Sequence, residues 1–442
     1  MNNLVLLLLR RWAGPALAAT LLLAAGDLAR AAEPREIDSA GGIKAWLAED
    51  HASPLLCLRF AFLGGSGTEP DGQAGITRLL ARMLVEGGGD DDAQVFRERM
   101  QRAGMRLQFQ AGRDALFGSV DILSSARTES TALLRAAVQN PKLDAATLET
   151  VKSRMLTDLS EAASDPRAVA NDRWYAESFA GLAYAHPPEG DPAGLAGIDR
   201  DKLARRHAVA LTRGTLVVAA AGDIAPDELG ALLDAVFGGL PEGVASGAQP
   251  VVPRTTADLM HVETSSPAAV IVFGAAAPPP GDPDHVAARI VAHILGSGDL
   301  DSRLFKRLRL DTSLVYSARA GILHDSRTTL LLGELGTSND KAESALDTLL
   351  VTLRSFAEDG PGDDEIALAK SALVGATLLG LDSTAAVADA LLDARLDGQP
   401  ADFLARRRGE LSAVTPAQVR SVARRLVAPK QFRIIVASTG QR

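Results

Sequence analysis

The stretch ALFGSVDILS, residues 115–124, predicts a β-strand, and a similar stretch, TTLLLGELGT, lies at 328–337. Each of the two is followed by a helical segment, a break that contains proline, and a second helix. Both of these second helices open on acidic residues, which a helix N-terminus favours. The same order of elements in two halves of one chain predicts a duplicated fold.

The ends of the two halves also match. Residues 199–224 and 415–440 each read as a capped helix that leads into an apolar strand. The matching segments start at 115 and 328, at 140 and 360, and at 199 and 415, so their offsets are 213, 220 and 216 residues. Such a steady offset predicts two copies of one α+β unit of about two hundred residues.

We expect these two homologous units at residues 32–240 and 264–442. The segment between them, 241–263, is rich in Gly, Pro and small polar residues, as a linker should be. The fold class is α+β, with each unit a mostly antiparallel sheet covered by helices. Two such units joined by a linker would form a clamshell around a cleft, which is the expected binding site.

Residues 1–31 have the composition of a secretory signal peptide, with an Arg-Arg pair, an apolar run at 16–25 and an A-x-A site at Ala29–Ala31. The apolar run is too short to span a bilayer comfortably. We expect cleavage near Ala31 and a periplasmic or otherwise exported protein. The alternative is a retained N-terminal anchor, because a second apolar run lies at 4–9.

Charge and cysteine content limit the kinds of partner. The formal net charge is −9, and the leader carries +2 of its own, which leaves −11 on the mature chain. This acidity, without a basic cluster, argues against nucleic acid and against anionic membrane surfaces. The single cysteine, Cys57, forms no internal disulfide and lies among apolar neighbours, so we expect a buried core residue.

Motifs of common catalytic centres are missing from the sequence. No two of the seven histidines are three or four residues apart, although His285 and His293 are eight apart on one predicted helix. The chain has no G-x-S-x-G elbow, Walker loop or dinucleotide fingerprint. By motif alone we expect no catalytic residue and no metal on this chain.

One helical stretch nevertheless resembles a known metal motif. GITRLLARMLVEGG, at 75–88, is similar in frame to G-L-A-H-x-L-E-H-M-L-x-x-G of the pitrilysin (insulinase) family of zinc metallopeptidases, matching at Gly75, Leu80, Met83, Leu84 and Gly87. In that alignment the two metal histidines fall on Arg78 and Arg82, and the general-base glutamate falls on Ala81.

The resemblance therefore implies a former zinc site that lacks the side chains needed to bind zinc and to activate water. A guanidinium is permanently charged and has no lone pair for a metal, and an alanine cannot activate water. The family's third ligand, a glutamate on a later helix, falls near Asp158, or near Glu161 if the register shifts. We expect this carboxylate to form an ion pair with Arg78 and Arg82 that holds the helices together.

A second stretch keeps its functional residues. Residues 298–321 resemble the family run S-S-R-L-F-x-x-L-R-x-x-x-G-L-x-Y-S, with Ser313 in place of the glycine. The resemblance implies that Arg309 and Tyr316, seven residues apart, hold a substrate carbonyl near the scissile bond. A guanidinium and a phenol O–H are suitable donors to such an oxygen as negative charge develops.

A lost metal motif beside a retained Arg and Tyr is similar to bacterial relatives of the mitochondrial processing peptidase. Some of these are heterodimers in which one chain supplies zinc and the other supplies the Arg and Tyr. We expect a non-catalytic subunit that is inactive alone and binds an extended peptide by strand addition. It would complete the active site of a homologous H-x-x-E-H subunit for endoproteolysis. Zinc is expected on that partner, and no cofactor is expected on this chain.

Two alternatives remain at this stage. The first is a structural or assembly pseudopeptidase, which would use a large apolar docking surface and would not need Arg309 or Tyr316. The second is a stand-alone peptidase with an unconventional metal site around Asp158, His285 or His293. It ranks below the others because no carboxylate lies between the two histidines.

Overall fold

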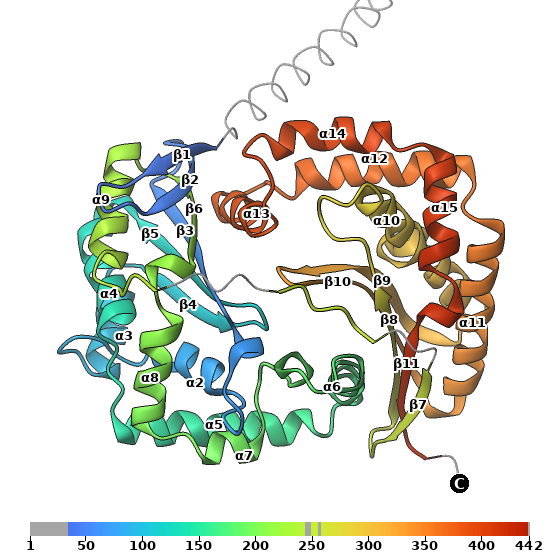
Figure 1. Ribbon diagram of the computed structural model, residues 1–442, viewed down its shortest axis with the longest axis horizontal. Coiled ribbons are helices and arrows are strands. Elements are labelled where there is room, and N and C mark those ends of the chain that lie inside the picture. Colours follow the sequence, from blue (N-terminus) through green and yellow to red (C-terminus); the bar gives the residue numbers. More distant parts are fainter. Residues whose placement is uncertain (1–33, 244–248, 255–257, 441–442) are drawn as a thin grey trace, which may run out of the picture.

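The computed structural model describes residues 34–243, 249–254 and 258–440 (Figure 1). The expected signal peptide, 1–31, lies outside these residues. The two halves of the chain form two units, each with a helical layer on its outer side and a sheet toward the middle of the molecule. In the described ranges, no helix combines the length and apolar character needed to cross a membrane.

The first sheet has six strands in the order β1-β2-β6-β3-β5-β4, and the second has five in the order β7-β11-β8-β10-β9. The pairs β2·β6 and β7·β11 are parallel, and every other neighbouring pair is antiparallel. The two sheets therefore share one topology, and β1 is an addition to the first. The strands are β1 (Arg35–Asp38), β2 (Lys44–Glu49), β3 (Leu55–Leu63), β4 (Arg106–Ala111), β5 (Ala115–Leu123), β6 (Leu216–Gly222), β7 (Asp258–Glu263), β8 (Ala268–Ala276), β9 (Val315–Asp325), β10 (Thr328–Ser338) and β11 (Arg433–Ser438).

The helices follow the predicted order in both halves. Several begin at a side-chain oxygen that accepts a hydrogen bond from the first turn, among them Asp92, Asp144 and Thr415. The helices are α2 (Ile76–Met83), α3 (Ala93–Arg102), α4 (Arg127–Gln139), α5 (Ala145–Ala162), α6 (Pro166–Ser178), α7 (Pro192–Ala196), α8 (Arg200–Ala210), α9 (Pro226–Phe237), α10 (His285–Ala292), α11 (Ala342–Asp359), α12 (Asp363–Leu379), α13 (Thr384–Leu396), α14 (Phe403–Ala413) and α15 (Pro416–Leu426), with π-helical turns at His293–Ser297 and Phe305–Asp311. The predicted α+β class with two sheets covered by helices is confirmed.

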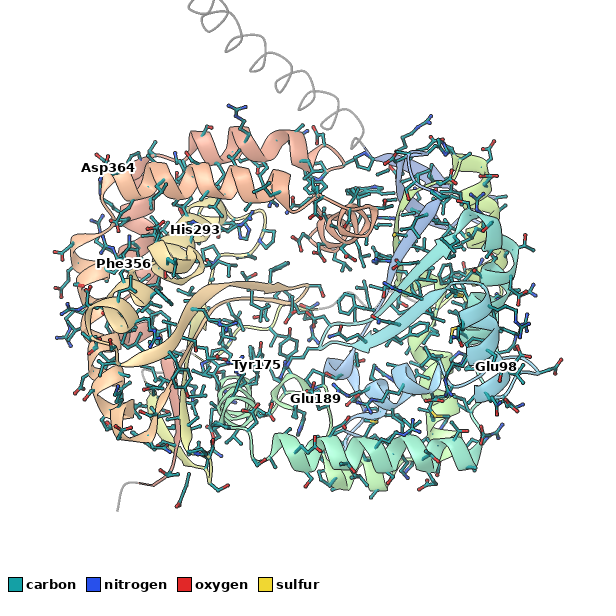
Figure 2. All side chains as sticks on the ribbon, turned by 180° about the vertical axis from the view of Figure 1, so that it is seen from behind. Glu98, Tyr175, Glu189, His293, Phe356 and Asp364 are labelled. Atoms are coloured by element: carbon teal, nitrogen blue, oxygen red, sulfur yellow. The ribbon has the colours of Figure 1, made fainter. Side chains whose placement is uncertain are left out.

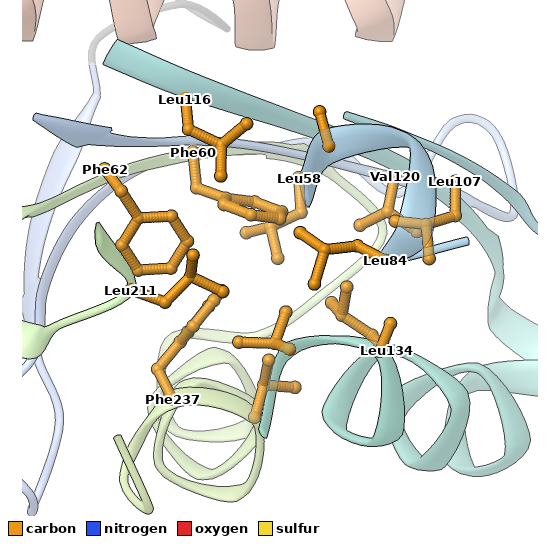
Figure 3. Close-up of a cluster of buried hydrophobic side chains, with 14 of the residues drawn as sticks. Leu58, Phe60, Phe62, Leu84, Leu107, Leu116, Val120, Leu134, Leu211 and Phe237 are labelled. Atoms are coloured by element: carbon orange, nitrogen blue, oxygen red, sulfur yellow. The ribbon is translucent and has the colours of Figure 1, made fainter. Parts of the chain in front are cut away.

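A glycine opposite a phenylalanine marks both copies of the duplicated strand. In the first core, Gly118 of β5 pairs with Phe60 of β3, whose ring fills the space above the glycine. Figure 3 shows the Phe60 ring among the buried side chains of this core. In the second core, Gly333 of β10 pairs with Phe273 of β8 in the same way. A Cβ on either glycine would lie within 2.2 Å of the phenylalanine ring, so the strand needs glycine there.

The two units exchange one helix each. Helix α6 of the first half packs on β8 and β11 of the second sheet, where the Trp174 indole donates to the Arg433 carbonyl at 3.2 Å. Helix α13 of the second half packs on β3 and β6 of the first sheet, and Arg59 of β3 contacts Asp389 of α13 at 2.6 Å. Each sheet is thus covered on one face by its own helices and on the other by a helix of the opposite unit (Figure 1).

The linker between the units is shorter than the sequence predicted, whereas Cys57 is buried as predicted. The expected linker, 241–263, is too long at its C-terminal end, because 258–263 form β7 and pair with β11. The side chains of β7 are mostly exposed, so the strand has no apolar run that would reveal it. The prediction for Cys57 is confirmed, since this free thiol is fully buried between the first sheet and α13.

Candidate functional site

The helix that resembles the zinc motif, α2, is held at its N-terminus by a half-buried carboxylate. Glu69 accepts hydrogen bonds from the backbone N–H groups of Gly75 and Thr77, both at 2.8 Å. Burial raises the pKa of Glu69, while these hydrogen bonds oppose the shift. The helix begins at Gly75 because this residue has a φ of 92°, a left-handed conformation that suits glycine. Its apolar side chains are buried in the first core.

The two arginines on α2 each have a separate acidic partner. Arg82 Nη2 lies 2.6 Å from Asp158 Oδ2 on α5, which confirms the expected ion pair at this position. Arg78 Nη1 lies 2.8 Å from Glu189 Oε1, so the expectation that it would pair with Asp158 or Glu161 is wrong. Two guanidinium groups one helical turn apart repel, and separate counterions relieve that repulsion.

Glu189 was missed by sequence reasoning. It lies in the loop before α7, toward the middle of the molecule (Figure 2), and 111 residues separate it from Arg78. The family motif points only to the later helix that carries Asp158. A loop carboxylate has no periodicity that would signal this contact.

The residues at the motif do not fit zinc. Two of the three ligand positions carry guanidinium groups, and the third, Asp158, is engaged by Arg82. Ala81, at the general-base position, is only 2% exposed and offers no polar atom. Across the described part of the chain, no three His, Cys, Asp or Glu side chains are placed to hold a metal ion. His285 in particular uses its Nδ1 on the Pro278 carbonyl at 2.8 Å.

Arg309 and Tyr316 lie close together around a tight turn. Arg309, in the π-helical turn Phe305–Asp311, donates from Nη1 to the carbonyl of Val315 at 3.1 Å, immediately before Tyr316. Between them Ser313 has a φ of 52°, the one positive φ of a non-glycine residue in the described ranges. That conformation explains why the family motif has glycine at this position. Both side chains are exposed, Tyr316 to 53%.

The Tyr316 side chain extends over the neighbouring strand β10. Its hydroxyl donates to the Thr337 carbonyl at 2.6 Å, and its ring lies against Gly336, where a Cβ would be 2.7 Å away. Burial raises the pKa of Tyr316, so the phenol stays protonated near neutral pH. Neither Gly336 nor Thr337 was identified from the sequence.

A groove of about 990 Å³ lies beside Tyr316. It follows β9, which is one of the two edge strands of the second sheet, and it includes Asn171 of α6 from the other unit. Leu300 and Phe305 give it an apolar wall. An edge strand next to an apolar groove is a suitable surface for an extended peptide.

Comparisons with known proteins agree with this arrangement. A family model described as insulinase (peptidase family M16) matches residues 48–190, and one described as the peptidase M16 inactive domain matches 197–373. The chain is 24% identical to the non-peptidase homolog YmxG of Helicobacter pylori over 331 residues, which cover 74% of this chain and 76% of that protein. It is 23% identical to an uncharacterized zinc protease of Mycobacterium bovis over 425 residues, 94% of this chain and 96% of that one.

A solved structure shares the fold. The peptidase M16 inactive domain from Pseudomonas fluorescens superposes with a TM-score of 0.86 at 23% identity, over 92% of this chain and 98% of that one. The duplicated fold and the altered motif on α2 define a peptidase-like protein without the usual metal ligands. The chain belongs to peptidase family M16, the insulinase family.

Proposed function

We propose that this protein is the substrate-binding, non-catalytic subunit of a heterodimeric zinc peptidase. One observation carries the proposal: the motif on α2 has no metal donors, while Arg309 and Tyr316 come from the two sides of one tight turn and are both exposed. Apart from the contact to Val315, the Arg309 guanidinium makes no hydrogen bond to another described residue.

The chemistry of the two side chains suits a carbonyl oxygen on an extended peptide. Arg309 offers its remaining N–H donors, and Tyr316 offers a protonated phenol once its bond to Thr337 is exchanged for a substrate. The peptide would lie along β9, with apolar side chains in the groove beside Leu300 and Phe305. A homologous subunit with an intact H-x-x-E-H helix would supply the zinc, and both subunits would be exported.

The test is reconstitution with such a subunit, followed by cleavage of a fluorogenic peptide. We expect that neither chain cleaves alone and that the mixture does. Arg309→Ala and Tyr316→Phe should each lower kcat/KM of the mixture by about a hundredfold, the size of effect seen when one donor to a developing oxyanion is removed.

Arg307→Ala is the matched control, because Arg307 lies on the same π-helical turn, is exposed and pairs with Asp311. It should leave cleavage unchanged. If Arg309→Ala and Tyr316→Phe also leave cleavage unchanged while the two chains still associate, the subunit has an assembly role and the proposal is wrong.

A further inference from the structure

A second cavity lies between the two units and adjoins the groove beside Tyr316 at Ile322, which lines both. Its volume is about 410 Å³. Its walls come from the β4–β5 turn of the first unit and, in the second unit, from α10, the β9–β10 turn, α13 and α14. Ionisable side chains dominate the lining. Neither the family motif nor the proposed peptide site uses this cavity.

One wall carries two arginines whose guanidinium groups make no direct contact with an acid. Neither the Arg289 nor the Arg407 guanidinium makes a hydrogen bond or a close ion pair within the described part of the chain, although the charges of Asp397 and Glu410 act on both. Burial, together with the charge of Arg407, lowers the pKa of Arg289 to about 10. Two partly buried guanidinium groups that repel each other form a site for a carboxylate, which can accept from both.

Two carboxylates in the same cavity have oxygens without a hydrogen-bond partner. Asp114 is 8% exposed, and its Oδ2 accepts from the Arg327 backbone N–H at 2.8 Å and from the Tyr184 hydroxyl at 3.2 Å. Its Oδ1 is buried and has no hydrogen-bond partner. The Asp393 carboxylate makes no hydrogen bond or ion pair with any described residue, and burial with the charge of Asp397 raises its pKa to about 6. Carboxylates left in this state favour an ammonium group.

The remaining lining supports a ligand with an apolar body. Phe117, Ile322 and Leu396 place apolar surface in the same cavity. Asp397 is already engaged, since its Oδ1 lies 3.3 Å from His324 Nε2. The cavity therefore offers guanidinium donors and carboxylate oxygens that are not hydrogen-bonded, together with apolar surface.

We propose that this cavity binds a small zwitterion, namely a free amino acid or a very short peptide with both termini unblocked. The α-carboxylate would lie at Arg289 and Arg407, the α-ammonium at Asp114 and Asp393, and an apolar side chain against Phe117 or Leu396. Such a ligand would contact both units at once. The inference does not depend on the role of Arg309 and Tyr316.

The experiment is calorimetric titration of the full chain with four probes: leucine, Leu-Leu, N-acetyl-Leu-Leu and Leu-Leu-amide. We expect leucine or Leu-Leu to bind, and the tighter of the two identifies the size of the ligand. Blocking either terminus of the dipeptide should weaken binding at least about tenfold, the cost of losing one charged contact. The proposal would be overturned if none of the probes gave a heat of binding at about 10 mM, a concentration at which even very weak binding is detected. Equal binding of blocked and free peptides would also overturn it.

Two variants test whether the α-carboxylate of the ligand binds at Arg289 and Arg407. Arg289→Gln and Arg407→Gln should each weaken Leu-Leu binding about tenfold and leave the amide unaffected, since the amide has no charge for them to meet. Arg408→Gln is the control, because Arg408 is an exposed neighbour on α14 that does not line the cavity. Using both arginine variants keeps the test valid if one fails to fold. Unchanged Leu-Leu binding in a folded variant would contradict the assignment.

Discussion

The guanidinium of Arg82 on α2 lies 2.6 Å from the carboxylate of Asp158 on α5, so two positions that align with zinc ligands contact each other directly. The pair joins the same two helices that a metal would join in an active relative. Its strength is limited, because 32% of the Arg82 side chain and 51% of the Asp158 side chain are exposed.

A double-mutant cycle on Arg82→Ala and Asp158→Ala measures this contact. We expect each single variant to lower the free energy of unfolding by less than about 1 kcal/mol, with a coupling of about 0.2–1 kcal/mol. Urea unfolding provides the measurement. The control is Arg97→Ala, whose side chain is 65% exposed and reaches Glu86 only at 3.5 Å. A coupling well above about 2 kcal/mol would mean that the pair behaves as a buried one.

Replacing Gly333, which lies against the Phe273 ring in the second core, should destabilise the protein. In Gly333→Ala the new methyl would lie 2.1 Å from Phe273 Cζ, so we expect a loss of at least about 2 kcal/mol in the free energy of unfolding. Thermal or urea unfolding measures it. Adding Phe273→Leu should recover part of the loss, because the smaller side chain frees the space.

Gly321→Ala is the matched control for this prediction. Gly321 lies on the neighbouring strand β9, and a Cβ there meets no heavy atom within 4 Å. We expect its effect to stay within about 0.5 kcal/mol. Equal effects of the two substitutions would show that the ring contact does not determine the need for glycine.

Cys57 should be chemically inert in the folded protein. It is fully buried, and burial raises its pKa to about 12, so the reactive thiolate is nearly absent at pH 8. We expect no labelling by iodoacetamide under native conditions and complete labelling in guanidinium chloride, read by mass spectrometry. Ser153→Cys in a Cys57→Ala background, where the new thiol is exposed on α5, should label at once. Native labelling of Cys57 would contradict its placement in the core.

Stability should depend on pH through Asp325. Its pKa is raised, first by burial and then by repulsion from Asp114. The folded state therefore favours the neutral acid, and this contribution is complete below the ordinary pKa of an aspartate and lost as pH rises through the raised value. Asp325→Asn imitates the neutral form and keeps an oxygen that can accept from Tyr184.

We expect Asp325→Asn to melt at the same temperature as the wild type near pH 3.5 and about 1–3 °C higher at pH 7. Differential scanning fluorimetry across this range measures the difference. Asp90→Asn, at an exposed position, should show no such trend. An advantage that is largest at low pH would have the opposite sign and would contradict the prediction.

The fold could be predicted from the sequence because the same order of strands and helices occurs in both halves of the chain. The apolar strand at 115–124 and its copy at 328–337 became β5 and β10, and the flanking helices followed. The strand β7 could not be predicted, since an exposed edge strand has no apolar pattern. The packing of α13 on β6 was also beyond the sequence, because no local signal specifies a contact between residues so far apart in the chain.

The candidate site was only partly predictable for a related reason. A motif fixes positions on one helix, so Arg78, Ala81 and Arg82 could be placed, and a second helix gave Asp158 as a partner. Glu189 comes from a loop, and the charges of the interunit cavity come from five separate segments. Such residues become neighbours only through tertiary packing, and single-sequence patterns do not record it.

The exchange of α6 and α13 also determines what would happen if the chain were cut between its units. Each fragment would hold the helix that covers the other fragment's apolar sheet face, so neither could bury both faces of its sheet alone. Fragments produced separately would aggregate, whereas fragments produced together would assemble into one particle. Gene fission at this point would therefore yield two polypeptides that fold only together. The linker mainly keeps the two units close to each other, because the exchanged helices already determine how the units pack.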